Sequence, residues 1–517
     1  MKLYKYLFLI PLMLFSACDL DKEPYGLTSF WNSEDDAWYG LNSAYQPFYE
    51  EEGYGRGHWW AGPLSDDMVY NRTRANEDPI VAFLEKNQNV LANNGSGGMY
   101  TNWQLMYKVI RRSNDVMKNV PEIDMSDKSR DIMLGEANFL CAYAYFYLAK
   151  RYGGLPFYDY NYPTEINKPR ETLNETYVRI EAYLKAAIDH FERQNLWTRS
   201  DTDWGRPNLG AAYTLLAKLY AHWAVADVNK YKECKAMCEK VIGKYSLNET
   251  GGNGFAHLFS PAGEKHEEVL FNLTNKAVRH QGSVTSVIIL SAKLSGGTGW
   301  YYFAPTQSLF KAYDPGDLRR KVTVVGYGDE VKYLGKTTIL DQENISDMTT
   351  GYMCNKYLAA YNDLGDWLWE SGQDVPLIRY ADALLLHAEA EIFLAGGGPD
   401  NRTQGVAAAA ESFNKVRVRA YGGDGTKAIA APTFNDLVKE RRCEFAYEDE
   451  RHYDLVRWGL AREIYLAGDV DGDLRGKRYF NPEVHRYLAL PQREMDNSDG
   501  VLVNNPLDGY SNFKAVK

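Results

Sequence analysis

The sequence predicts a mainly α-helical protein in which tetratricopeptide-like helix pairs form a scaffold beside an irregular, loop-rich lobe. Apolar residues recur at three- and four-residue steps in segments 133–152, 209–223 and 381–395, which is the spacing of a helix with a buried face. Each segment mixes alanines with large apolar residues, so neighbouring helices can approach closely. A second helical pattern follows each of the three, and we expect four or so helix pairs in the mature chain.

The second helix of each pair has its own start or stop signal. Thr172 and Glu175 form a capping-box pattern that opens a helix over residues 177–191. Residues 231–245 follow the second segment after a short break. Residues 405–420 follow the third segment after a run of three glycines and a proline that should end the preceding helix. Each of the three helices is therefore expected to have a helical neighbour.

The helical period fades between residues 251 and 373. Glycine, proline, aspartate and asparagine there separate short apolar runs, such as 269–273 and 322–325, which predict brief strands among loops. We therefore divide the mature chain into an N-terminal region, 30–250, and a C-terminal region, 251–517, and expect the two to form one compact unit.

The first residues have the pattern of a secretory signal. Lys2 and Lys5 precede about a dozen mostly apolar residues, which is shorter than the roughly 20 that a transmembrane helix needs. Small residues then lead to Cys18, and this site resembles the lipobox of bacterial lipoproteins. We expect residues 1–17 to be removed, Cys18 to carry a lipid anchor to the membrane, and residues 18–29 to form an acidic tether.

Composition and motifs exclude several classes of function. The net charge of −11 argues against nucleic acid as a partner. The sequence lacks a nucleotide fingerprint, a zinc-protease motif and a nucleophile elbow, so we expect neither catalysis nor a cofactor. Cys234 and Cys238 lie one helical turn apart without further ligands nearby, and residues 469–473 lack the closing glutamate of a calcium loop. We therefore expect no bound metal.

Charged residues near the C-terminal end repeat at three- and four-residue spacing. Glu440, Arg441, Glu444, Glu448 and Arg451 could pair along one face of a helix. We interpret them as a salt-bridge network that holds the fold and does not contact a ligand.

Aromatic residues gather in three loop segments flanked by glycine, and these are the candidate ligand-binding sites. Tyrosine, tryptophan and phenylalanine together make up 14% of the chain. Tyr and Trp offer flat apolar faces with polar edges, which suits sugar rings, although local packing is the alternative for each of them. The candidates are Trp59, Trp60, Asp66, Asp67, Tyr70, Asn71 and Arg72 in the first segment, Trp300, Tyr301 and Tyr302 in the second, and Trp367 and Trp369 in the third.

The order of several sequence blocks resembles the SusD/RagB family of outer-membrane lipoproteins. The resemblance covers nearly all of the mature chain and is carried by residues 30–37, 107–114, 135–156, 376–390, 414–420, 440–445 and 451–459. Two positions depart from the family pattern: Cys141 stands where arginine is usual, and Asp449 stands where glycine is common. Both departures look structural.

The resemblance implies a SusD-like fold and a surface lipoprotein that captures an oligosaccharide and passes it to a SusC-like, TonB-dependent outer-membrane barrel. In that family, aromatic and polar residues from the first two loop segments hold the ligand, and no bond is made or broken. The acidic residues after Cys18 resemble the signal that sends Bacteroidetes lipoproteins to the cell surface. Two alternatives remain open at this point, a peptide-binding lid of a similar transporter and a helical scaffold without a small ligand.

Overall fold

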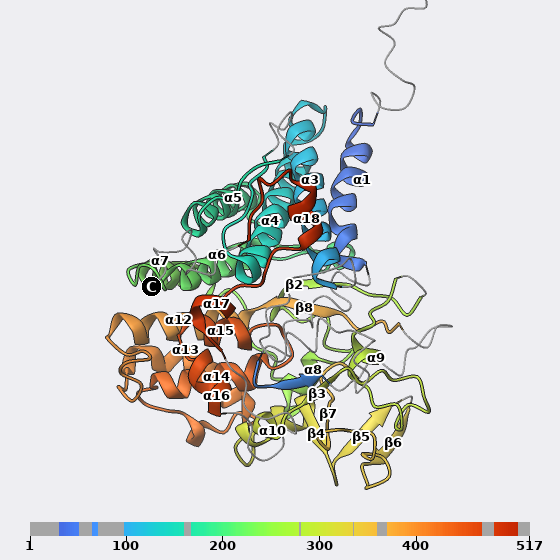
Figure 1. The fold of residues 1–517 in the computed structure, drawn as a ribbon, viewed down its shortest axis with the longest axis vertical. Helices are drawn as coiled ribbons and strands as arrows, with labels where there is room; N and C mark the ends of the chain where they lie inside the picture. The colour runs from blue at the N-terminus through green and yellow to red at the C-terminus, as the bar shows by residue number, and fades with distance from the viewer. Residues whose placement is uncertain are drawn as a thin grey trace, which may run out of the picture.

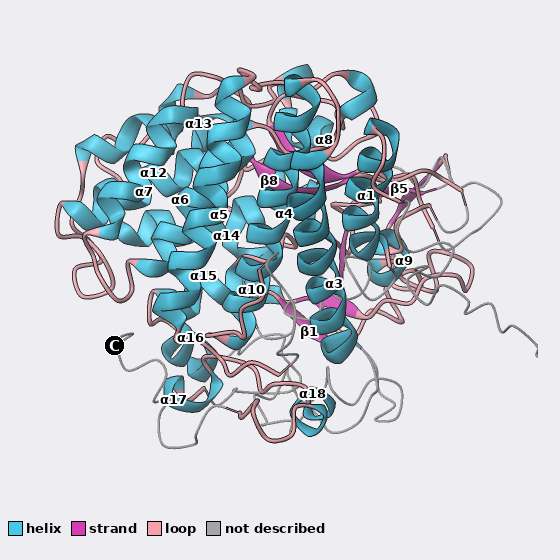
Figure 2. Ribbon diagram, turned by 90° about the horizontal axis from the view of Figure 1, so that it is seen from above, coloured by secondary structure: helices cyan, strands magenta, loops and turns pink. Residues whose placement is uncertain are grey.

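The computed structural model describes residues 30–50, 65–70, 98–159, 167–278, 281–333, 335–358, 370–467 and 480–504. Four helix pairs pack in one continuous row that runs across Figure 2. The pairs are α1 (Glu34–Tyr45) with α3 (Gly98–Asn119), α4 (Asp127–Tyr152) with α5 (Leu173–Arg193), α6 (Leu209–Trp223) with α7 (Lys230–Val241), and α12 (Tyr380–Leu394) with α13 (Ala410–Ala420). The predicted mainly helical, tetratricopeptide-like architecture is confirmed.

Helix α4 packs between α3 and α5 in this row and is buried on almost every side. Its residues alternate alanine with large aromatic and aliphatic side chains, as expected of a helix that is enclosed by neighbours. Gly135 allows α4 and α5 to approach closely, because a Cβ at this position would lie 2.5 Å from the ring of Phe191 on α5. By length and composition α4 could also cross a membrane, but 89% of its apolar window is buried inside the protein.

The helix boundaries follow the expected capping rules. Thr172 accepts a hydrogen bond from the backbone of Glu175, whose side chain accepts one from the backbone of Thr172, so the predicted capping box is present at the start of α5. Ser33 caps α1 in a similar way by accepting a bond from Asp36. These local bonds satisfy donors that the first turn of a helix leaves free.

The second lobe consists of short helices and two-stranded antiparallel sheets, and it lies below the upper helices in Figure 1. The strand pairs are β1 (Met68–Tyr70) with β3 (Phe303–Pro305), β2 (Val269–Leu273) with β8 (Val375–Arg379), β4 (Val324–Gly326) with β7 (Tyr352–Cys354), and β5 (Glu330–Tyr333) with β6 (Lys336–Ile339). The predicted strand at 269–273 is β2. The strand predicted at 322–325 begins two residues later, because the short helix α11 (Arg319–Thr323) precedes it.

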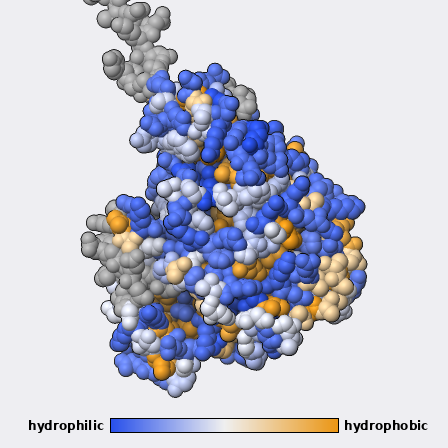
Figure 3. All heavy atoms as spheres, turned by 180° about the vertical axis from the view of Figure 1, so that it is seen from behind, coloured by the Kyte–Doolittle hydropathy of each residue, from blue (hydrophilic) through white to orange (hydrophobic). Residues whose placement is uncertain are grey.

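The remaining helices lie in the C-terminal half of the chain. They are α8 (Gly254–Leu258), α9 (Thr285–Ile289), α10 (Gln307–Ala312), α14 (Phe434–Phe445), α15 (Arg451–Arg457), α16 (Ala461–Ala467), α17 (Pro482–His485) and α18 (Gln492–Asn497). Helix α12 from this half packs against α6 and α7 from the N-terminal region, so the row of helices crosses the division at residue 250. On the face shown in Figure 3, hydrophilic residues cover most of the surface and apolar residues form scattered patches.

The predicted salt-bridge network exists, but its pairing along one helix face is wrong. Helix α14 ends at Phe445, and the chain then turns through left-handed φ angles of 65° at Tyr447 and 60° at Asp449. Glu444 therefore pairs with Arg319, Arg379 and Arg419, which come from distant parts of the chain. Every one of these side chains is at most 1% exposed. The network therefore joins helix α13 of the row to three segments of the second lobe, α11, β8 and α14.

Asp449 explains one departure from the family pattern. A φ of 60° is a conformation that favours glycine, and a non-glycine residue there needs a compensating interaction. The carboxylate of Asp449 forms a buried ion pair with Arg151 at the end of α4, with 2.6 Å between Oδ2 and Nη2. The side chain that replaces glycine thus ties the turn after α14 to helix α4.

Candidate functional site

Two of the predicted loop segments meet in the structure, although more than two hundred residues separate them in the sequence. Strand β1 pairs antiparallel with β3, which places Tyr70 opposite Phe303. The ring of Tyr70 stacks on that of Tyr302 with 6.1 Å between centroids, and Tyr302 meets Trp300 edge-on at 5.6 Å. We call Tyr70, Trp300 and Tyr302 the aromatic cluster.

The backbone on either side of the cluster is held rigidly. Trp300 donates its backbone N–H to the carbonyl of Val287, and Tyr302 donates to Ile288, so residues 300–302 lie along α9. Tyr301 has a left-handed φ of 47°, so the chain turns locally between Trp300 and Tyr302 before β3 begins at Phe303. Trp300 and Tyr302 are partly exposed, whereas Tyr301 between them is 2% exposed. The cluster can therefore offer Trp300 and Tyr302 to a ligand.

Tyr301 belongs to the packed core of the second lobe. Its ring lies among Val69, Leu290 and Met353, and its hydroxyl donates to the backbone carbonyl of Tyr352. Burial raises the pKa of this hydroxyl well above its usual range. For this candidate residue the structure favours the packing role over direct contact with a ligand.

Asp66 and Asp67 anchor the first segment to helices α14 and α15. Asp66 forms a two-pronged pair with Arg451, at 2.8 and 3.0 Å, and also contacts Arg442. Burial alone would raise the pKa of Asp66, but the charges of Arg442 and Arg451 outweigh it and hold that pKa well below its usual range. Asp67 pairs with Arg442 at 2.7 Å and is 1% exposed.

Both carboxylates are thus engaged in ion pairs inside the protein, and these pairs position the strand that carries Tyr70. Tyr70 itself is 2% exposed, so its ring packs against that of Tyr302 and has almost no surface that a ligand could contact. The other predicted residues lie outside the described part of the chain: Cys18, Trp59, Trp60, Asn71, Arg72, Trp367 and Trp369.

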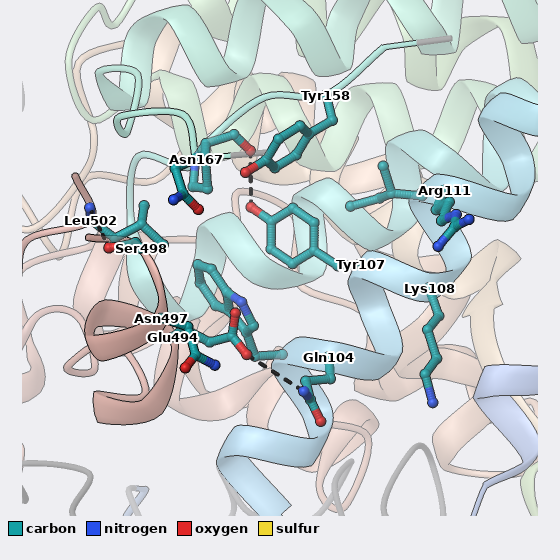
Figure 4. A pocket seen from close by; sticks show the side chains of 13 residues that line it. Gln104, Tyr107, Lys108, Arg111, Tyr158, Asn167, Glu494, Asn497, Ser498 and Leu502 are labelled. Atoms are coloured by element: carbon teal, nitrogen blue, oxygen red, sulfur yellow. Dashed lines mark hydrogen bonds between the residues drawn. The ribbon is translucent and has the colours of Figure 1, made fainter. Parts of the chain in front are cut away.

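A pocket that the sequence analysis did not single out lies between α3 and α18, with a volume of about 370 Å³ (Figure 4). Its apolar lining includes Trp103 and Tyr107 from α3 and Tyr158 from the segment after α4. Polar side chains on its lining are Gln104, Lys108, Arg111, Asn167, Glu494, Asn497 and Ser498. One wall of the pocket could have been recognised in the sequence. Four-residue steps separate Trp103, Tyr107 and Arg111, so they lie on one face of a helix. Its other walls required the tertiary structure.

The pocket walls are fixed by hydrogen bonds between distant segments. Tyr107 donates its hydroxyl to the carbonyl of Pro156 at 2.9 Å, and its ring meets that of Tyr158 edge-on at 5.9 Å. Tyr158 in turn is held by two bonds between its backbone and the hydroxyl of Tyr145. Asn167 donates to Asp499 at 3.3 Å, which ties the C-terminal wall to the segment before α5.

The described residues contain no group of three or more His, Cys, Asp or Glu side chains arranged to hold a metal ion. Cys141, Cys234, Cys238, Cys354 and Cys443 are buried free thiols. Burial raises the pKa of Cys354 to about 12, as expected of an inert core thiol. His387 lies on α12 and contacts Ser412 through Nδ1 at 3.0 Å.

Comparison with known proteins identifies the family. Residues 184–510 match the model of the SusD family, and residues 41–221 match a model described as starch-binding associating with outer membrane. SusD-like protein P2 of Formosa agariphila is 24% identical over 99% of this chain and 100% of its own length. SusD-like protein P38 of the same organism is 29% identical over 90% of this chain and 93% of its own.

Solved structures agree on the fold. Surface glycan-binding protein A from Bacteroides thetaiotaomicron, solved in complex with laminarihexaose, superposes with a TM-score of 0.72 at 21% sequence identity. The match covers 92% of this chain and 100% of that one. A family model that spans residues 184–510 and relatives that match from end to end lead to one conclusion: this chain belongs to the SusD family.

Proposed function

We propose that this chain binds oligosaccharides at the bacterial surface and passes them, chemically unchanged, to a SusC-like, TonB-dependent outer-membrane transporter. The observation that carries the binding step is the aromatic cluster, in which two separate segments bring partly exposed Trp300 and Tyr302 together over Tyr70. Rings arranged on a rigid backbone can stack against sugar faces without a large ordering cost. The starch- and glycan-binding descriptions of the matched family model and structure support the same ligand class.

The transport step and the membrane anchor rest on the family and on the N-terminal sequence. SusD-family membership and the description of an association with the outer membrane support a barrel partner. The lipobox-like site at Cys18 supports attachment through lipid, and two or more acyl chains are enough for stable anchoring. Binding alone accounts for this role, so no catalytic step is assigned to the chain.

Replacing Trp300 by alanine is expected to weaken oligosaccharide binding by about ten- to a hundredfold, because stacking and buried area are lost together. The thermal midpoint should change little, because the side chain is partly exposed. A glycan array that includes laminarihexaose selects the probe, and calorimetric titration with that probe measures the affinity. Trp38→Ala is the matched control, since Trp38 is also partly exposed but lies on α1. Equal affinities for wild type and Trp300→Ala would place the site elsewhere.

The peptide-binding alternative gives a different result in the same assay. If no glycan on the array binds and defined peptides are captured instead, the cargo is a peptide and not an oligosaccharide. Absence of both ligand classes would favour the scaffold alternative, in which the exposed aromatics form a protein interface.

Growth with a labelled fatty acid tests the anchor and the partner together. The wild type is expected to carry the label and to copurify with a large barrel protein in mild detergent. Cys18→Ala should lose the label and leave the membrane fraction, because no acyl chain remains to hold it. A labelled Cys18→Ala protein would contradict the anchor, and repeated recovery of the wild type alone at native expression would contradict the barrel partner.

A further inference from the structure

The pocket between α3 and α18 has the dimensions and chemistry of a ligand site separate from the aromatic cluster. Its volume of about 370 Å³ lies within the range of about 300–1,000 Å³ that is typical of small-molecule sites. None of the aromatic cluster residues lines it. Its walls come from α3, the segment after α4 and the C-terminal segment.

The polar groups are distributed unevenly around the central ring of Tyr107. Figure 4 shows Asn167, Glu494 and Asn497 on the side of α18, and Lys108 and Arg111 on the other side of the ring. A ligand that spans the pocket would therefore meet amide groups at one end, an aromatic ring at the centre and two cations at the other end. This sequence of contacts suits an elongated molecule with hydroxyl groups and a terminal negative charge.

The two cations are available to a ligand. Both Lys108 and Arg111 are exposed, and neither forms an ion pair within the described part of the chain. Arg111 also interacts electrostatically with Asp115, which lies one turn further along α3 and does not line the pocket. Glu494 is the single carboxylate on the lining, and it accepts a hydrogen bond from Gln104.

The pocket lining thus carries two positive charges and one negative charge in a chain whose net charge is −11. An acidic protein repels anionic ligands at long range, so a local excess of cations has an effect only at close contact. Arginine can bind a carboxylate or sulfate through two parallel hydrogen bonds, and lysine adds a point charge beside it.

We propose that this pocket is a second carbohydrate-binding site that selects sugars bearing a carboxylate or a sulfate group. The inference rests on the proposed oligosaccharide-binding function and adds a ligand class and a place. Lys108 and Arg111 bind the anionic group, the ring of Tyr107 lies against a sugar face, and the amides of Asn167 and Asn497 bond with hydroxyl groups. The aromatic cluster binds neutral oligosaccharides.

The test compares three probes: trigalacturonate for the carboxylate, a heparin-derived tetrasaccharide for the sulfate, and laminarihexaose as the neutral probe. The double variant Lys108→Gln/Arg111→Gln is expected to lose about five- to thirtyfold in affinity for at least one acidic probe, since each exposed charge pair contributes modestly. Its affinity for the neutral probe should not change. Raising the salt concentration should weaken acidic binding to the wild type and have less effect on the variant.

Two control variants make the result specific. Lys118→Gln/Lys128→Gln removes the same net charge from exposed lysines that do not line the pocket, and it should bind the acidic probes as the wild type does. Trp300→Ala should weaken the neutral probe and spare the acidic contact at α3. Which acidic probe responds to the double variant identifies the carboxylate or the sulfate as the recognised group.

The outcomes separate this inference from the function on which it rests. Neutral binding that depends on Trp300, with acidic binding absent or unaffected by the double variant, would overturn the second site and leave the proposed function in place. An equal loss of acidic binding in the Lys118/Lys128 control would also overturn it, because the effect would then come from net charge. A chain that binds none of the neutral or acidic sugars on an array would overturn both proposals.

Discussion

Replacing Glu444 by alanine should lower the free energy of unfolding by about 3–5 kcal/mol, because it removes from three buried arginines a carboxylate that they share, although each keeps another acidic partner. Glu444 is 0% exposed, and its carboxylate accepts bonds from Arg379 at 2.9 Å, Arg419 at 2.6 Å and Arg319 at 3.0 Å. Three guanidinium groups would thus lose one shared counter-charge in a place that water does not reach. Denaturant unfolding monitored by tryptophan fluorescence measures the change.

The control is a glutamate in an exposed pair. Glu411 lies on α13 and contacts Lys415 at 3.1 Å, with 84% of its side chain exposed. Glu411→Ala should therefore change stability by less than about 0.5 kcal/mol. Similar losses in the two variants would show that the buried pairing adds little beyond an exposed one.

The contribution of the Glu444 carboxylate to stability should depend on pH. Burial acts to raise the pKa of Glu444, but the charges of Arg419, Arg379 and Arg319 outweigh it and hold that pKa far below the ordinary glutamate value. A depressed folded-state pKa contributes stability that is complete above the unfolded value of about 4.5 and is lost as pH falls below it. The difference between wild type and Glu444→Gln should therefore shrink below pH 4.5, by about 1.4 kcal/mol per pH unit.

Local patterns in the sequence were sufficient for the helices and insufficient for this network. Helical spacing, the Thr172 capping box and the glycine run before Pro399 act within a few residues, so the row of helix pairs could be predicted. Glu444, in contrast, pairs with Arg379 and Arg319, which lie 65 and 125 positions away. The spacing of acidic residues after 440 suggested one helix face, and the turn after Phe445 separates them.

The candidate site shows the same limit. Glycine-flanked aromatics identified the segment 300–302, but the direction of each side chain depends on which face of that segment packs on the second lobe. The backbone at Tyr301 has a left-handed φ of 47°, which the sequence did not indicate, and there Tyr301 enters the core while Trp300 and Tyr302 remain partly exposed. The pocket beside α3 depends on α18, almost 400 residues further along, as the 390-residue separation of Gln104 and Glu494 shows.

Tyr301→Ala is therefore expected to destabilise the protein by about 3–5 kcal/mol, because a buried ring is removed from a packed core. Tyr301→Phe keeps the ring and loses only the hydroxyl bond to the carbonyl of Tyr352, so it should cost about 1 kcal/mol. Tyr327→Ala is the control, since Tyr327 is 66% exposed and should change stability by less than about 0.5 kcal/mol.

Binding separates this packing role from ligand contact. The folded fraction of Tyr301→Phe should bind the array-selected oligosaccharide as tightly as the wild type, whereas Trp300→Ala should bind it weakly and melt normally. Calorimetric titration beside thermal melts of the same samples gives both quantities. A Tyr301→Ala protein that melts like the wild type but has lost affinity would show that the ring turns outward to meet the ligand. The opposite order, with Trp300 needed for stability and Tyr301 for binding, would contradict the burial of Tyr301 and the partial exposure of Trp300.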